Sequence, residues 1–422
     1  MIVELVTAPL KTIHTKTIHN RQVISLSYVR PVAIVGVGQS RFGRVPDMTL
    51  NELAWQAVKQ ALKDAGITQK DVQMVSFANV GGWSAEPLPA ISVNEYSGLT
   101  GVGTYRIEAA CASGSAALTT AYNIIASGSA DVALVVGVER MNESLTPTVV
   151  ELIGRAGNYF WEFSQFGLTF PGYYALYATA YMNEYGAREE DLAAVSVKNH
   201  YYGSFNPYAA FQKRITVEDV MRSRYVAWPL KLYDCSPVTD GAAAVVLASA
   251  EVAKKLTDTP IWIRGIGYAS DTSNLSKRPS FLNLEAARRA AQEAYRKAGI
   301  DPSKPHKQLD VAEVHDCFTI AEVIAYEDLG FARPGTGYML AREGETYKGG
   351  LIPVNLDGGL KAKGHPIAAT GVSMAGEIAK QLRQQNPKDR QADIIHGVGL
   401  AHNIGGTGHY AYVTVYSLEK GG

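Results

Sequence analysis

One cysteine and one histidine, each followed by a run of small residues, are the residues best suited to chemistry in this chain. Cys111 lies in IEAACASGSAALTTAYN, where an apolar strand pattern ends and a small-residue helix pattern begins. A thiol at such a junction faces the free N–H groups and the positive dipole end of the helix, which stabilise a thiolate. The alternative is that Cys111 is a small buried hydrophobe, the usual state of a free cysteine.

His365 lies in NLDGGLKAKGHPIAATG (355–371), where glycines permit a tight backbone path and Pro366 fixes the chain behind the imidazole. A histidine held on such a loop can accept the proton of a thiol, which is how a cysteine nucleophile is activated. The alternative is a histidine with a purely structural role. The same glycines do not follow the GxxxxGK[ST] order of a phosphate-binding loop.

The segment EVHDCFTIAE (313–322) contains a second pair of titratable groups. His315 and Cys317 are two residues apart, and residues at that spacing on a strand point to the same face. One of them would donate a hydrogen bond to a developing oxyanion, and the other would carry a proton beside the nucleophile. The alternative is that Cys317 packs in the core and only His315 acts.

A glycine-rich turn precedes the last predicted strand, in HNIGGTGHYAYVTVY (402–416). Backbone N–H groups without side chains in the way, here those of Gly405 and Gly406, are the usual material of an oxyanion hole. His402 at the start of this segment either takes part in catalysis or fills a polar corner.

Alternating strand and helix patterns must position these groups. The strand patterns cover 31–43, 73–80, 105–110, 131–140, 240–249, 260–270 and 311–317, and the helix patterns cover 51–67, 113–128, 284–300 and 318–331. Such alternation predicts an α/β fold with a mostly parallel sheet covered by helices on both faces.

Two pairs of similar segments indicate an internal duplication. YRIEAACASGSAALTTA and VAEVHDCFTIAEVIA each run from a strand through a cysteine into a helix, and NELAWQAVKQALKDAGI is similar to LEAARRAAQEAYRKAGI. Because both pairs come in the same order, we predict two similar α/β halves related by a pseudo-twofold axis. The active groups would then meet where the halves face each other.

The predicted organisation is an N-terminal extension (1–30), an N-terminal half (31–250) and a C-terminal half (251–422). Residues 142–229 are dense in Tyr and Phe and lose the alternation, so we interpret them as an inserted domain of helix and loop that lies over the half around it. The extension is basic and lacks the apolar core and cleavage site of a secretory signal. It is interpreted as an unstructured extension or an over-long start, with an organellar presequence as the alternative.

Composition excludes several classes of protein. Lys+Arg and Asp+Glu are both 40 among 422 residues, which is not the balance of a nucleic-acid or anionic-membrane binder. The three cysteines, Cys111, Cys235 and Cys317, have no CxxC spacing, which argues against a disulfide framework or a zinc ribbon and favours the cytoplasm. No uninterrupted apolar run is long enough to predict a transmembrane helix.

Four motifs, taken together, are specific to one family. EAACASGSAAL, SPVTDGAAA, HDCF and GGLKAKGHPIAATG, in this order and spacing, resemble the thiolase superfamily from about residue 31 to the end. HDCF in place of NEAF is similar to the sterol-carrier-type branch, and HNIGG most resembles archaeal acetyl-CoA acetyltransferases. The resemblance implies a five-layer αβαβα fold, acyl-CoA thioesters as substrates, and neither a metal nor a permanently bound cofactor.

The same resemblance implies roles for individual residues. Cys111 would be the acyl-accepting nucleophile, His365 its activating base, and His315 a holder of the thioester oxygen of the incoming acetyl unit. Ser236, in CSPVTDGAAA, matches a position that contacts the pantetheine arm of coenzyme A.

One departure from the family pattern concerns the proton carrier. His402 stands where most thiolases have the cysteine of a CxG motif, so the acid/base role is assigned to Cys317, with His402 as a second candidate. The expected reaction is condensation of two acetyl-CoA to acetoacetyl-CoA, or the reverse thiolysis, through a Cys111 acyl-enzyme. The alternatives are a thiolase for longer 3-oxoacyl-CoA, a thioester-dependent aldolase and a non-catalytic acyl-CoA-binding scaffold.

Coenzyme A is polyanionic at its nucleotide end and requires a local cluster of cations. Lys213 and Arg214, after the aromatic stretch of the insertion, are candidates for that contact; the alternative is a solvated surface pair. The resemblance also implies a homodimer or homotetramer, and a complex with a hydroxymethylglutaryl-CoA synthase of mevalonate supply and a small accessory protein. We predict no nucleic-acid or membrane partner.

Overall fold

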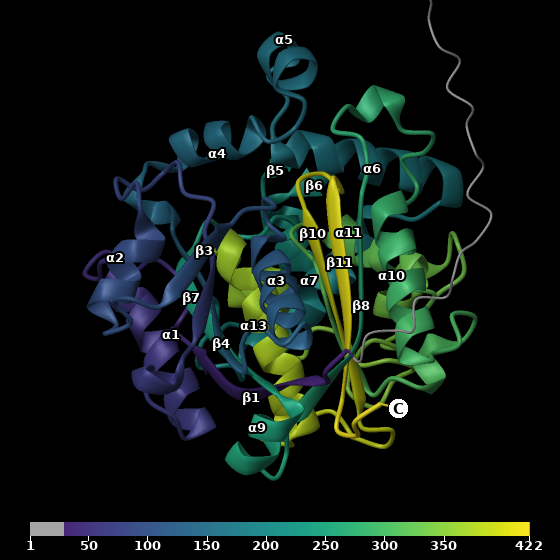
Figure 1. The fold of residues 1–422 in the computed structure, drawn as a ribbon. Coiled ribbons are helices and arrows are strands. Elements are labelled where there is room, and N and C mark those ends of the chain that lie inside the picture. Colours follow the sequence, from purple (N-terminus) through teal and green to yellow (C-terminus); the bar gives the residue numbers. More distant parts are fainter. Residues whose placement is uncertain (1–28, 422) are drawn as a thin grey trace, which may run out of the picture.

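The structure, a computed structural model, describes residues 29–421 (Figure 1). The predicted extension 1–30 lies outside the described residues except for its last two. Of these, Arg30 forms an ion pair with Asp131 at 2.7 Å and donates hydrogen bonds to the carbonyls of Ile125 and Ala130. Arg30 is therefore part of the N-terminal half.

In the described part of the chain, nine strands form one mixed sheet in the order β3-β2-β4-β7-β1-β8-β11-β10-β9. The strands are β1 (Val32–Gln39), β2 (Met74–Ala78), β3 (Gly103–Ile107), β4 (Val132–Arg140), β7 (Asp240–Ser249), β8 (Ile261–Ser270), β9 (Val311–Val314), β10 (Val398–Gly405) and β11 (Tyr410–Ser417). β1 and β8 pair at only two positions, so this sheet consists of two halves joined at a narrow seam.

The prediction of a mostly parallel sheet is wrong. β2 pairs in parallel with β3 and β4, and β9 with β10, whereas the other pairings are antiparallel. The alternation of strand and helix patterns does not show the direction of the strand that follows two of the connections, β4 to β7 and β10 to β11. β10 and β11 form a hairpin, and the long insertion between β4 and β7 brings the chain back in the opposite direction.

Helices cover both faces of each half-sheet and produce the expected five-layer αβαβα arrangement. α1 (Leu50–Ala65) and α2 (Pro89–Tyr96) lie outside the first half-sheet, and α10 (Glu285–Ala298) lies outside the second (Figure 1). Between the two half-sheets lie α3 (Ser113–Ala126) and α13 (Ile367–Leu382), packed on each other. The short helix α9 (Ala250–Leu256) packs on β1 and β7.

The duplication is visible in the sheet. The order β1-β7-β4-β2 of the first half is repeated as β8-β11-β10-β9 in the second, with the same sequence of antiparallel and parallel pairings. α1 packs on β1 and β7, and α10 packs on β8 and β11, so the second pair of similar segments does correspond in the fold.

The first pair of similar segments does not correspond. β9 is equivalent to β2, so the turn with His315 and Cys317 matches the chain after β2. The equivalent of β3 is the segment at Val354, which bridges β9 in parallel as β3 bridges β2. Cys111 at the start of α3 therefore corresponds to His365 at the start of α13. A strand, one cysteine and a helix are too short a pattern to establish the repeat.

The predicted insertion is mostly helix and loop. It contains α4 (Thr146–Gly154), a π-helical turn (Tyr159–Phe163), α5 (Ser164–Phe166), α6 (Phe170–Tyr185), α7 (Glu189–Gly203), α8 (Val217–Arg222) and β5 (Tyr225–Ala227), which pairs with β6 (Leu230–Lys231). α4, α5 and α6 lie across one end of the strands (Figure 1).

The insertion does not simply lie over the half that surrounds it. α6 and α7 pack against α11 (Thr319–Asp328), and α7 also packs against α12 (Gly337–Arg342), both in the C-terminal half. Tyrosines on one side of α6 explain this position, because Tyr173, Tyr174, Tyr177 and Tyr181 are each at most 1% exposed. Burying such rings is strongly favourable, and α11 offers the apolar surface. No helix in residues 29–421 combines the length and apolar character needed to cross a membrane.

Candidate active site

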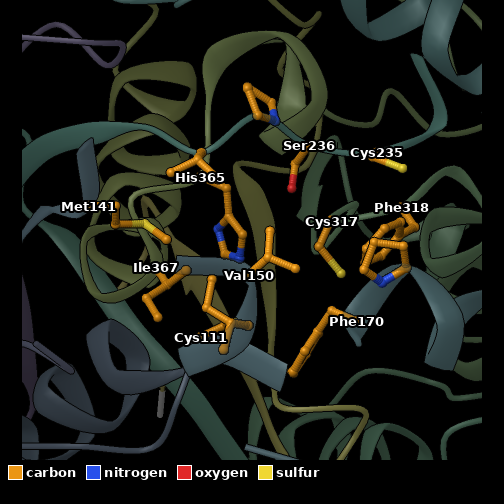
Figure 2. Close-up of a pocket in the computed structure, with 14 residues that line it drawn as sticks. Cys111, Met141, Val150, Phe170, Cys235, Ser236, Cys317, Phe318, His365 and Ile367 are labelled. Carbon is orange, nitrogen blue, oxygen red and sulfur yellow. The ribbon is translucent and has the colours of Figure 1, made fainter. Parts of the chain in front are cut away.

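A mostly apolar cavity of about 110 Å³ lies where α3, α13 and the insertion meet the turn after β9 (Figure 2). Four of the residues singled out in the sequence line it: Cys111, Ser236, Cys317 and His365. Side chains from the insertion, including Phe170, close one side. The two halves and the insertion therefore contribute to one pocket, as the duplication predicted.

Cys111 lies at the N-terminal end of α3, directly after Ala110, which has a left-handed φ of 50°. This left-handed conformation, which glycine adopts most readily, turns the chain sharply from the strand into the helix. The backbone N–H groups of Gly406 and of Cys111 itself contact the thiol and favour the thiolate. Burial outweighs them and raises the pKa of Cys111 to about 12, so Cys111 is a thiol at rest and needs a base to ionise it.

His365 is held by two threonines. Its backbone N–H donates to Thr239 Oγ1 at 2.7 Å, and its Nδ1 lies 2.7 Å from Thr370 Oγ1. The Thr370 hydroxyl also lies 3.2 Å from the Pro366 carbonyl; when it donates its one proton there, Nδ1 is the donor to Thr370. This leaves the Nε2 lone pair free, and Nε2 has no other partner among the described residues.

The charge state of His365 follows from its surroundings. Burial, and then the nearby Lys363 cation, lower the pKa of His365 to about 3. The imidazole is therefore neutral at rest, with Nε2 available to accept a proton.

His315 has the opposite tautomer, and Asn403 determines it. The Asn403 amide nitrogen lies 3.1 Å from the Cys111 carbonyl, which can only accept, so this nitrogen must be the donor. The same nitrogen lies 3.1 Å from His315 Nδ1. His315 Nδ1 is then the acceptor and Nε2 carries the proton. Burial lowers the pKa of His315 well below its usual value, which keeps the ring neutral.

Cys111, His315 and His365 converge. Their sulfur and one ring nitrogen from each histidine all lie within 4.8 Å of one another, and the two rings meet edge to face with centroids 5.1 Å apart. A thiol, a proton acceptor and a proton donor thus face one small volume. A thiolate and two imidazoles are also ligands that Zn²⁺ accepts.

Cys317 and Ser236 lie side by side at the same cavity (Figure 2). The Ser236 backbone N–H donates to the Cys317 carbonyl at 2.9 Å, which ties the SPVTDGAAA segment to the HDCF turn. Cys317 is 4% exposed, and burial, followed by the neighbouring Cys111, raises the pKa of Cys317 well above its usual range. Cys317 is a neutral thiol at rest and can donate or, once ionised, accept a proton.

The glycine turn lies between β10 and β11 and reaches Cys111. Gly406 has φ 65°, and a side chain there would collide with His409, while one at Gly405 would collide with the Ala109 carbonyl. The turn can therefore approach Cys111 only with glycines. Of the two glycine N–H groups predicted as oxyanion-hole donors, that of Gly406 contacts the Cys111 thiol, so the role stays a prediction for Gly406.

Six residues singled out in the sequence do not line the cavity: His315, Gly405 and Gly406, which lie close to Cys111 or to its neighbours, and His402, Lys213 and Arg214. Alternation along β10 places His402 on the opposite face from Asn403, away from Cys111; neither ring nitrogen of His402 finds a partner among the described residues. Lys213 and Arg214 are exposed and do not line the cavity, and the Arg214 guanidinium stacks on Tyr201 and Phe205. A catalytic role for His402 and coenzyme A contacts from Lys213 and Arg214 find no geometric support.

Sequence reasoning missed the residues that orient the catalytic groups. Thr370, Thr239 and Asn403 set ring orientation and tautomer, and none stands out by type. Asn403 had a weak signal, since it follows His402 in the segment already singled out. Tyr174, 1% exposed and stacked on Phe318, had only the general density of aromatic residues in the insertion.

Comparisons with known proteins agree with this geometry. Residues 32–251 match the family model "Thiolase, N-terminal domain" and residues 267–418 match "Thiolase C-terminal domain-like". The acetyl-CoA acetyltransferase of Methanothermobacter thermautotrophicus is 41% identical, covering 92% of this chain and 100% of that protein. Sterol carrier protein 2 of Gallus gallus is 32% identical, covering 92% of this chain and 72% of that protein.

Among solved structures, the Ltp2-ChsH2(DUF35) aldolase superposes with a TM-score of 0.79 at 26% identity, covering 93% of this chain and 99% of that chain. Both family models together span nearly the whole described chain, and the motifs that carry the resemblance surround one cavity. The chain therefore belongs to the thiolase family.

Proposed function

We propose that this protein is an acetyl-CoA C-acetyltransferase, which joins two acetyl-CoA into acetoacetyl-CoA or cleaves acetoacetyl-CoA with coenzyme A. The observation that carries the proposal is the convergence of the Cys111 sulfur with one ring nitrogen of His365 and one of His315, all within 4.8 Å of one another. The 41% identity to an acetyl-CoA acetyltransferase over the whole of that protein supports it. Coenzyme A thioesters are substrates here, not resident cofactors.

In the first half-reaction, His365 Nε2 takes the Cys111 proton, and the thiolate attacks the acetyl carbonyl of acetyl-CoA. The Gly406 N–H and the backbone N–H of Cys111 hold the oxyanion of the tetrahedral intermediate. The intermediate collapses to acetyl-Cys111, and coenzyme A leaves as a thiol with the Cys317 proton. The enzyme is left with a His365 imidazolium and a Cys317 thiolate, whose opposite charges form together in a buried pocket.

In the second half-reaction, the Cys317 thiolate removes an α-proton from a second acetyl-CoA. His315 Nε2–H donates to the thioester oxygen and stabilises the enolate. The enolate carbon attacks acetyl-Cys111, acetoacetyl-CoA forms, and the departing Cys111 thiolate takes the proton back from His365. All groups return to their resting protonation states, and the two steps predict ping-pong kinetics.

The small apolar cavity beside Cys111 supports a short acyl group over a longer one. We expect Ser236, which lines the same cavity, to contact the pantetheine arm. The proposal also includes a role in mevalonate supply, a cytoplasmic location and a homodimer or homotetramer. It further includes a complex with a hydroxymethylglutaryl-CoA synthase and a small accessory protein. These parts are supported only by the resemblance of this chain to its relatives.

The aldolase is the second candidate, because a solved structure of that activity superposes with a TM-score of 0.79. Such an enzyme needs an enolate but no acyl-enzyme. Retention of Cys111 beside a free base favours the thiolase.

The deciding experiment mixes the purified protein with acetyl-CoA and measures its intact mass and tryptic peptides. We expect one acetyl group on Cys111 and none in Cys111→Ala. In Cys317→Ala we expect slower acetylation, because the leaving coenzyme A loses its proton donor, together with lost condensation. Thiolysis of 3-oxoacyl-CoA substrates of increasing length then tests the short-chain preference. Normal turnover by Cys111→Ala would overturn the thiolase assignment, and retro-aldol cleavage without acetylation would favour the aldolase.

A further inference from the structure

The aspartate of the HDCF turn is a residue that the proposed mechanism does not use. Asp316 directly precedes Cys317, is fully buried, and does not line the cavity. Its Oδ1 accepts the Leu360 N–H at 2.6 Å, and its Oδ2 accepts the Lys361 N–H at 3.1 Å. Both donors lie in the turn that leads to His365, so one carboxylate joins the segment with the proton carrier to the segment with the base.

The contact between these two segments depends on glycine. Gly359 has φ 57°, a left-handed conformation, and an ideal Cβ there would collide with the Asp316 carboxylate. A third bond to Asp316 comes from the Asn199 amide of α7, at 2.7 Å. All three partners are donors, which fits a side chain that only accepts.

Lys361 completes a closed ring of bonds around Cys317. Its side chain is 1% exposed, and its ammonium group donates to the Cys235 carbonyl. The N–H of the next residue, Ser236, donates to the Cys317 carbonyl at 2.9 Å. Because Asp316 already holds the Lys361 backbone, these bonds close a ring that begins and ends beside the Cys317 thiol. The ring leaves the backbone on both sides of this thiol little freedom to move.

We propose that Asp316 and Lys361 are positioning residues, which together fix Cys317 at the place where it can exchange protons with a substrate bound beside Cys111. This inference rests on the proposed function, in which Cys317 protonates the leaving coenzyme A and then removes the α-proton of the second acetyl-CoA. Asp316 and Lys361 act by holding the backbone, and no proton or covalent bond of either changes in the reaction.

His365 is held separately from this ring. Thr239 bonds its backbone N–H, and Thr370 bonds its Nδ1. Weakening the ring should therefore displace Cys317 more than His365, and reactions of Cys111 that need only its base should survive. Alkylation of Cys111 by iodoacetamide is such a reaction.

The test substitutes Asp316→Asn, which keeps the shape of the side chain. Whichever way the amide turns, its NH₂ group faces a backbone N–H of the neighbouring turn, so at least one bond to that turn is lost. Acetylation of Cys111 is measured by rapid-quench mass spectrometry, and removal of the α-proton by exchange of the acetyl-CoA methyl group in D₂O. We expect both to slow about 10- to 100-fold, because Cys317 acts in both and a misplacement of about 1 Å costs about 10²-fold. Alkylation of Cys111 should stay within a few-fold of wild type.

Either of two results would overturn the proposal. Acetylation and exchange that both stay near wild type in folded Asp316→Asn would show that Cys317 does not need this carboxylate. An equal loss of Cys111 alkylation would show that the substitution disturbs the whole site rather than the position of Cys317.

Asp310→Asn is the matched control. Asp310 lies directly before β9, whereas Asp316 follows the same strand, and it is 5% exposed. It likewise accepts backbone N–H groups, those of His396, Gly397 and Val398. The substitution sets an NH₂ group against backbone donors at the end of β9 away from the cavity, so we expect a lower melting temperature with acetylation and exchange unchanged. Equal slowing in both variants would mean that lost stability explains the effect, and the proposal would be wrong.

Asn199→Ala tests whether Asp316 serves the insertion instead. It removes the amide that bonds both Asp316 and Glu322, each at 2.7 Å, and leaves the two backbone donors to Asp316 in place. We expect acetylation and exchange near wild type. A loss as large as that of Asp316→Asn would assign the effect to the anchoring of α7 and refute the proposed positioning.

Lys361→Met keeps the inference testable where Asp316→Asn does not fold. It retains an unbranched apolar side chain and removes the bond to the Cys235 carbonyl. Removing a buried charge also removes its desolvation cost, so this variant should fold. We expect the same two steps to slow with alkylation retained, and normal acetylation and exchange would overturn the inference. Wild-type protein that forms no acetyl-Cys111 would instead refute the proposed function.

Discussion

Two histidines face the same thiol with opposite tautomers, and a neighbour of each decides which. Thr370 accepts from His365 Nδ1 and leaves its Nε2 as a base, whereas Asn403 donates to His315 Nδ1 and leaves its Nε2 as a donor. Burial keeps both rings neutral at rest. The proposed roles of base and oxyanion donor therefore depend on the hydroxyl and the amide that bond to the two Nδ1 atoms.

Asn403→Asp tests this division. A carboxylate cannot donate to His315, so the ring should turn its Nδ1 proton toward Asp and leave Nε2 without one, which removes the enolate donor. We expect condensation to fall about 10²- to 10³-fold, the usual loss for one oxyanion-hole donor, with acetylation of Cys111 less affected. Steady-state condensation and rapid-quench acetylation measure the two effects.

Ser115→Ala is the control for that substitution, because the Ser115 hydroxyl donates at 3.0 Å to the other side of the Asn403 amide. It removes support for the amide without changing the group presented to His315. An equal loss in both variants would show that Asn403 matters only for packing.

At the scale of elements, the contact between α3 and α13 brings Cys111 and His365 together, since each residue precedes one of these helices. Small residues make the contact close: a side chain at Gly114 would lie 2.7 Å from the Ala368 carbonyl oxygen. Close approach of two helix starts from different halves is what the duplicated fold contributes to the site. The helices also bury the groups they carry, which explains the raised pKa of Cys111.

Gly371→Ala should separate these helices. An ideal Cβ at Gly371 would lie 2.5 Å from the Ser115 backbone nitrogen and would also collide with the Asn403 side chain. Overpacking of this kind destabilises by about 1–3 kcal/mol, so we expect a lower melting temperature together with a large loss of condensation. Calorimetry and the condensation assay check both.

Gly376→Ala, five residues along α13, is the matched control, because its ideal Cβ meets nothing closer than 3.8 Å. Alanine there should leave stability unchanged or raise it by up to about 1 kcal/mol through helix propensity. Equal effects of the two alanines would contradict a specific contact at Gly371.

At the scale of the whole molecule, the core holds an unusual set of buried titratable groups of both kinds. Burial lowers the pKa of His402 to about 3 and raises that of Glu139 to about 8. A buried neutral histidine costs stability as the pH falls, because the unfolded chain takes up a proton that the folded chain refuses. A buried protonated carboxyl costs stability as the pH rises, because the unfolded chain releases a proton that the folded chain keeps. Stability should therefore decline on both sides of neutrality.

His402→Leu isolates one of these groups. The pKa of folded His402 is lowered from 6.5 to about 3. Its contribution to the unfolding free energy is therefore complete above about pH 6.5 and is lost as the pH falls below that value. Between about pH 7.5 and pH 5, wild type should lose about 2 kcal/mol more unfolding free energy than the variant, at about 1.4 kcal/mol per pH unit below 6.5. Urea unfolding at both pH values measures the difference.

The same variant tests the position of His402. Because the side chain faces away from Cys111, methyl-group exchange of acetyl-CoA should persist in His402→Leu. Loss of exchange in a stably folded variant would restore His402 as the proton carrier.

The sequence alone predicted most elements of the two halves and the candidate residues that meet at the cavity. The strand predicted at 240–249 has the same bounds as β7, and Cys111, His315, Cys317 and His365 meet as their motifs implied. Such features are encoded over a few neighbouring residues: apolar periodicity, glycine at tight turns, and short motifs around a reactive group.

Only the tertiary structure decided what each group does. Four features depend on residues far apart in the chain: the direction of the strands, the equivalence of Cys111 with His365, the burial that makes Cys111 a thiol at rest, and the buried side chain of His402 on the face of β10 opposite Asn403. So do the tautomers, since Asn403 lies 88 positions from His315. A pKa or a tautomer is set by whichever groups surround the ring or thiol in space, and local sequence does not specify them.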